Sequence, residues 1–131
     1  MNESGPAVKR LLTTYNLSPY GGSPAGRQPT NLLVVHDEID LPFGQMRLSH
    51  SGAAGHKGVE SIINSVGNGY ARLRIGIENR KEYRVPPTDD YVLQNFTKEE
   101  QTRLKKVIIP EAISKIQQWI LNSKSQITNH K

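Results

Sequence analysis

The apolar run Leu32-Leu33-Val34-Val35, which ends abruptly at the polar block His36-Asp37-Glu38-Ile39-Asp40, constrains the fold of this chain most. A continuous apolar run with β-branched residues is typical of a strand buried on both faces, as in parallel sheets covered by helices. Ligands bind at the carboxyl ends of strands in open α/β sheets, so the block lies where reactive carboxylates are expected. Taken alone, the composition of the block favours a turn of solvated charges, which is the commoner case.

The remaining segments alternate between helical and strand patterns. A helix is predicted over residues 4–15, with Ser4 as its N-cap, Pro6 in its first turn and one apolar face made of Ala7, Val8, Leu11, Leu12 and Tyr15. A second helix over residues 59–66 stops at Gly67. A third begins at the capping box Thr97-Lys98-Glu99-Glu100, and Pro110 should kink it.

Strands are expected at residues 45–49 and, from alternating apolar and basic residues, at 72–77. The order of these elements predicts an α/β fold: a single domain with a mixed, mostly parallel sheet flanked by helices. The chain has 131 residues, which suits one domain over 1–131. Residues 18–30, rich in Gly, Pro and Ser, are expected to form a solvated loop, and residues 121–131 a flexible tail.

Composition excludes several classes of protein and of site. The absence of cysteine rules out disulfides, thiolate catalysis and cysteine-ligated zinc. No apolar window of about 18 residues exists, so no membrane span is expected, and the N-terminus does not look like a secretory signal. The net charge of +5 favours a polyanionic partner such as nucleic acid, although many proteins with this charge bind none.

Two further clusters carry possible chemistry. The segment Gly55-His56-Lys57-Gly58 precedes a helix, where backbone N–H groups and a lysine can meet a phosphate or a carbonyl oxygen. An ordinary glycine-rich connection explains it equally well. A metal site made from His36, Asp37, Glu38 and either His50 or His56 is a weaker hypothesis, since no paired-histidine helical spacing supports it.

Several motifs in a fixed order resemble the bacterial-type peptidyl-tRNA hydrolase family. They are Met1-Asn2-x-Ser4-Gly5-x-Ala7-Val8, LLVVHDEIDLPFGQMRL, Gly55-His56-x-Gly58, RLRIGI and DYVLQNF, and they cover residues 1 to about 120. The resemblance implies an enzyme that hydrolyses the ester between a peptide and tRNA, with no metal or organic cofactor. It also implies peptidyl-tRNA as the partner, a monomeric complete form, and a location in the cytoplasm or the mitochondrion.

The resemblance also assigns roles to individual residues. Asp37 matches an aspartate that holds and polarises the general-base histidine, and Asn2 matches an asparagine that positions the peptide and the water. Met1 and His56 match substrate-binding positions, and Lys57 stands where the family usually has an asparagine. A carboxylate at a strand end suits the role of Asp37, because it can fix an imidazole tautomer and stabilise the imidazolium.

Three arginines are expected to face the phosphates of the tRNA acceptor stem. Arg74 matches a basic position of the family, and Arg47 and Arg72 are included because they lie on the same or a nearby strand. Arg72 and Arg74 alternate with Leu73 and Ile75, which predicts one basic and one apolar face for that strand.

The chain departs from the family pattern at its start. The resemblance places the catalytic histidine and a sheet strand in an N-terminal section that would precede Met1, so an N-terminally truncated, catalytically impaired domain is expected. The alternative is a non-catalytic tRNA-binding protein. A strand left without its neighbour is expected to make the chain marginally stable and prone to aggregate or dimerise. Glu78-Asn79-Arg80 also replaces the usual glycine-rich ending after RLRIGI.

Overall fold

The computed structural model describes residues 3–15, 32–50, 55–67 and 70–128, with side chains as far as residue 122. Its elements are α1 (Ser4–Thr14), β1 (Leu33–Pro42), β2 (Met46–Ser49), α2 (Lys57–Val66), β3 (Ala71–Glu78), α3 (Thr88–Tyr91), α4 (Lys98–Arg103), a π-helical turn (Leu104–Ile108) and α5 (Ile109–Thr128). The predicted order of helices and strands is confirmed, and the short α3 is added to it. The predicted 18–30 loop lies outside the described residues.

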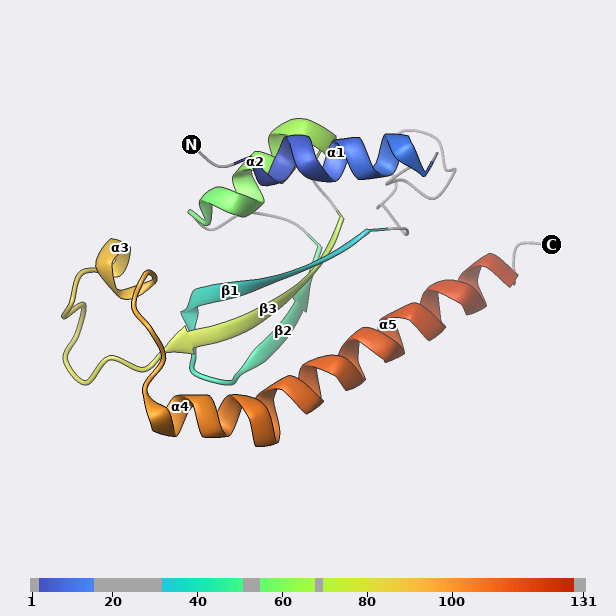
Figure 1. The fold of residues 1–131 in the computed structure, drawn as a ribbon. Coiled ribbons are helices and arrows are strands. Elements are labelled where there is room, and N and C mark those ends of the chain that lie inside the picture. The colour runs from blue at the N-terminus through green and yellow to red at the C-terminus, as the bar shows by residue number, and fades with distance from the viewer. Residues whose placement is uncertain (1–2, 16–31, 51–54, 68–69, 129–131) are drawn as a thin grey trace. The chain divides into compact units, whose positions relative to one another are not determined.

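The three described strands form one sheet in the order β1-β3-β2. Figure 1 shows the arrows of β1 and β3 pointing the same way, while β2 runs in the opposite direction. One neighbouring pair is therefore parallel and the other antiparallel. The prediction of an α/β fold with a mixed sheet is confirmed.

The connection from β1 to β2 crosses β3 at Gly76. The N–H of Gly44 donates to Gly76 O over 3.0 Å, and the N–H of Gly76 donates to Gln45 O over 2.7 Å. A Cβ at residue 76 would lie 2.0 Å from Pro42 O, far inside van der Waals contact. Only glycine lets the chain pass so close to the strand, which explains the glycine within RLRIGI.

The chain forms two compact units, one of residues 1–36 and 48–73 and the other of residues 37–47 and 74–131. In the first unit, α1 packs against α2 through Gly5, whose N–H donates to Ser61 Oγ over 2.9 Å. A Cβ on Gly5 would lie 1.9 Å from Ser61 O, so the two helices can approach only because residue 5 is glycine. The core of this unit is built on Val59, Ile62 and Tyr70.

The apolar face predicted for α1 is only partly correct. The residues that turn inward are Gly5, Val8 and Leu12, whereas Leu11 and Tyr15 are exposed. The close contact at Gly5 sets the rotation of the helix, and a pattern of apolar residues does not reveal such a contact. The predicted N-cap is wrong, because Glu3 takes that position and Ser4 is the first residue of the helix.

In the second unit, the capping box at Thr97 is confirmed: Thr97 Oγ1 accepts from the N–H of Glu100, and Glu100 Oε1 accepts from the N–H of Thr97. The π-helical turn ends shortly before Pro110, which has no N–H to donate to the preceding turn. Figure 1 shows the helix changing direction between α4 and α5, as the proline predicted. The backbone of α5 continues to Thr128, and the flexibility expected of residues 121–131 stays a prediction.

Candidate functional site

The polar block His36–Asp40 lies inside β1 and not after it. The apolar run predicts a strand that ends at Val35, but β1 continues to Pro42 because it pairs along β3. His36 and Glu38 are buried, while Asp37 between them is exposed, as the alternation of a strand requires. The expected burial of both faces at Leu32–Val35 is also wrong, since Val35 is exposed on a strand at the end of the described sheet.

Glu38 and Arg74 form an ion pair between neighbouring strands. Arg74 Nε donates to Glu38 Oε1 over 2.8 Å, and the Glu38 side chain is only 2% exposed. A buried carboxylate is costly unless a cation or hydrogen-bond donors compensate it. Arg74, which is predicted to contact tRNA, therefore also compensates the buried charge of Glu38.

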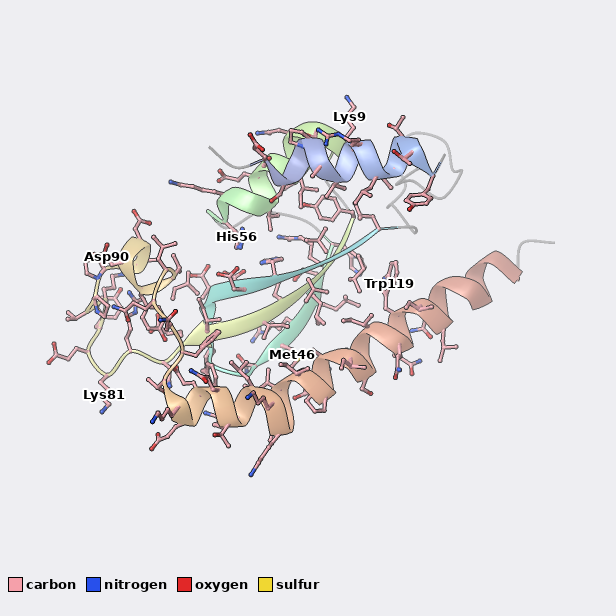
Figure 2. All side chains as sticks on the ribbon, in the orientation of Figure 1. Lys9, Met46, His56, Lys81, Asp90 and Trp119 are labelled. Carbon is pink, nitrogen blue, oxygen red and sulfur yellow. The ribbon has the colours of Figure 1, made fainter. Side chains whose placement is uncertain are left out.

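His56 is the N-cap of α2, and Figure 2 shows it at that end of the helix. Its Nδ1 accepts from the N–H of Val59 over 3.2 Å, so in the neutral ring the proton sits on Nε2. The His36 ring lies against it, with centroids 4.8 Å apart and planes inclined by 66°. Edge-to-face contact of this kind favours one orientation of the His56 ring. Lys57 follows as the exposed first residue of α2.

The remaining predicted site residues differ in their exposure to solvent. Arg47 is exposed on β2, but Arg72 is only 3% exposed, because β3 is the middle strand of the described sheet and both its faces are covered there. The prediction that Arg72 faces phosphates at the surface is therefore withdrawn, as is the basic face predicted for that strand. Met1 and Asn2 lie outside the described residues.

Among the described residues, no three His, Asp or Glu side chains are grouped to hold a metal ion.

A hydrogen-bonded cluster at the end of β3 was not predicted from the sequence. Arg80 Nε donates to Glu78 Oε1 over 2.9 Å, Tyr91 Oη donates to Ile77 O over 2.7 Å, and Asn79 Nδ2 donates to Glu100 Oε2 over 3.0 Å. These bonds join β3 to α3 and to the start of α4. The departure Glu78-Asn79-Arg80 was visible in the sequence, but its partners lie up to 21 residues further on.

Hydrogen bonds in this cluster change the acidity of two glutamates. The side-chain hydrogen bonds from Arg80 hold the pKa of Glu78 below its ordinary value. Burial alone would raise the pKa of Glu100, but the hydrogen bonds from Thr97 and Asn79 outweigh burial and lower it. Both carboxylates are therefore stabilised in the charged form.

None of the helices that the structure describes has the length and apolar character of a membrane span.

Comparison with known proteins gives consistent matches. The family described as "Peptidyl-tRNA hydrolase" matches residues 1–131. The chain is 37% identical over 124 residues to a peptidyl-tRNA hydrolase of Lactiplantibacillus plantarum, covering 93% of this chain and 60% of the relative. It is 41% identical over 126 residues to one of Persephonella marina, covering 93% of this chain and 57% of the relative.

A crystal structure of peptidyl-tRNA hydrolase from Acinetobacter baumannii has the same fold over the matched part. It aligns with a TM-score of 0.70 at 30% identity and covers 98% of this chain and 60% of that protein. The chain thus spans about 60% of the length of these relatives.

Proposed function

The chain belongs to the peptidyl-tRNA hydrolase family, and on that premise we propose that it is the larger part of an enzyme that hydrolyses the ester between a peptide and tRNA. The observation that carries the proposal is the family match over the whole of residues 1–131. The reaction belongs where peptidyl-tRNA is made, in the cytoplasm or the mitochondrion.

In this proposal a histidine acts as general base on a water molecule. The water oxygen attacks the ester carbonyl, its proton passes to the imidazole, and the ribose oxygen leaves with a proton. Asp37 holds the imidazole in the reactive tautomer and stabilises the imidazolium that forms. The exposure of its carboxylate on β1 supports this role, because a group that orients another side chain must be reachable.

Neither His36 nor His56 is assigned as the general base. His56 is held by the hydrogen bond from the N–H of Val59 and by the ring contact with His36, and this fixed position suits the substrate-binding role that the resemblance implies. Asn2 positions the peptide and the water, Met1 contacts the peptide, and Lys57 replaces the family asparagine with a cation. A polypeptide of residues 1–131 alone, without the base, is accordingly expected to hydrolyse peptidyl-tRNA slowly.

Arg47, which is exposed, contacts phosphates of the tRNA. Arg74 contacts a phosphate while its Nε stays bonded to Glu38. The excess of 17 Lys and Arg over 12 Asp and Glu supports an electrostatic contribution to binding. Each phosphate contact that is lost should reduce the slope of log affinity against log salt by about one.

The proposal is tested by measuring peptide release from peptidyl-tRNA and tRNA binding on two proteins. One is residues 1–131 alone, and the other is the same chain preceded by the N-terminal section that the family resemblance places ahead of Met1, taken from the Lactiplantibacillus plantarum relative. We expect the fusion to release peptide about 10²–10⁴ times faster than residues 1–131 alone, which is the usual contribution of a positioned general base. A fusion that binds tRNA with no release would favour the non-catalytic tRNA-binding alternative.

A further inference from the structure

Tyr83 and Arg84 form the tip of a tight turn between β3 and α3. The turn is closed by the N–H of Val85, which donates to Glu82 O over 3.2 Å, so these two residues are its central pair. Tyr83 is 85% exposed, and the Arg84 guanidinium carbon lies 5.1 Å from the centre of its ring. The tip therefore displays an aromatic ring with a cation over one face.

The backbone of the turn is unusual at Arg84. Its φ of +55° lies in the left-handed region, which glycine adopts freely and which arginine adopts only at a cost. Non-glycine residues in such conformations gather at functional sites, where the strain is offset by the surrounding structure. Arg84 thus keeps a cation at a position where glycine would be less strained.

The base of the turn is held firmly. The buried guanidinium of Arg80 donates from Nη1 to Pro86 O over 2.9 Å and to Thr88 Oγ1 over 3.2 Å, and it also bonds Glu78. It lies 5.1 Å from the centre of the Tyr91 ring. Both sides of the turn are held by these contacts. A ligand that binds the tip therefore does not lose free energy by ordering the turn.

Charge at the tip is mixed but locally basic. Figure 2 shows Lys81 on the outer side of this loop and Asp90 further along in α3. Glu82 flanks the turn, and Asp89 and Asp90 lie in the first turn of α3. A purely phosphate-binding surface would not place acids so near, whereas stacking on the ring tolerates them.

We propose that Tyr83 and Arg84 form a stacking platform for an unpaired base of the RNA substrate. This inference rests on the proposed function, since tRNA carries unpaired bases at its 3′ end and in its loops. Unpaired bases stack on aromatic rings and on arginine guanidinium planes regardless of sequence. With Arg84 over one face of Tyr83, the open face receives the base and the cation strengthens the stack.

The test measures binding of a short RNA hairpin with an unpaired 3′ end, using the fluorescence of a 2-aminopurine placed there. We expect Tyr83→Ala to weaken binding by about 5- to 150-fold without changing the salt slope, which is the range for loss of one stacked base. Tyr83→Phe should bind as the original chain does. Tyr15→Ala is the matched control, because Tyr15 is a 69% exposed tyrosine on the other compact unit.

A second variant separates binding from folding. Arg84→Gly should raise the unfolding temperature, because glycine relieves the positive φ, and should nevertheless weaken binding of the hairpin. Equal binding by the original chain and by Tyr83→Ala would overturn the stacking platform and leave the proposed function standing. Failure of the original chain to bind any RNA would contradict the proposed function itself.

Discussion

Arg74 Nε and Glu38 Oε1 lie 2.8 Å apart and join the neighbouring strands β3 and β1 by a charged hydrogen bond. The pair combines a carboxylate that is almost fully buried with a residue that the family resemblance assigns to tRNA. Any loss of RNA binding in an Arg74 variant must therefore be separated from a loss of stability.

We expect Arg74→Met to destabilise the chain by about 3–5 kcal/mol, because it leaves the Glu38 carboxylate buried without its cation. Urea unfolding measures this directly. The double variant Arg74→Met/Glu38→Met should recover most of the loss, since it removes the buried charge as well. If Arg74→Met cost less than about 1 kcal/mol, the ion pair would have no important structural role.

Gly76→Ala should destabilise the chain by more than about 1–3 kcal/mol, the usual cost of overpacking, because the new methyl would meet the backbone oxygen of Pro42. Gly55→Ala is the control. The new methyl of Gly55→Ala would lie in open space, so it meets no neighbouring atom. This variant is destabilised only because alanine adopts a φ of +80° less readily than glycine does. Similar unfolding free energies for the two variants would contradict the crossing over Gly76.

Acid should weaken the cluster at the end of β3. Hydrogen bonds from Arg80 lower the pKa of Glu78 from its ordinary 4.5, so the stabilisation is complete above pH 4.5 and is lost as pH falls through the folded value. Urea unfolding at pH 6 and at about pH 3 should therefore show a smaller acid-induced loss for Glu78→Gln than for the original chain. Glu82→Gln is the control, because Glu82 is an exposed glutamate of the nearby turn. Its free energy of unfolding should fall with acid by as much as that of the original chain.

Self-association should occur through β1, which lies at one end of the described sheet and exposes Val35. Lysine on an edge strand opposes pairing with another chain. We expect Val35→Lys to lower the apparent mass in light scattering at high concentration, with Val107→Lys on the π-helical turn as control. A strictly monomeric original chain that unfolds cooperatively well above 50 °C would contradict the expectation of marginal stability.

Local signals in the sequence predicted local structure well. The Thr97 capping box and the Gly67 stop are both found in the structure, because each depends on residues within one helical turn. The mixed α/β fold followed from the order of such elements. The site residues assigned by resemblance remain proposals.

Long-range contacts explain where sequence reasoning failed. The length of β1 depends on pairing with β3, the burial of Arg72 depends on the central place of β3, and the rotation of α1 depends on the contact of Gly5 with Ser61. None of these partners lies near in sequence. A periodic pattern cannot reveal them.

The role of Asp37 is tested by the rate of peptide release by the fusion protein carrying Asp37→Asn or Asp40→Asn. Both aspartates are exposed on β1, so the two changes are matched in type, strand and exposure. We expect Asp37→Asn to lower the rate about 10²–10⁴-fold and Asp40→Asn to leave it within a few-fold. Equal rates in the two variants would contradict the assignment of Asp37 as the residue that holds the general base.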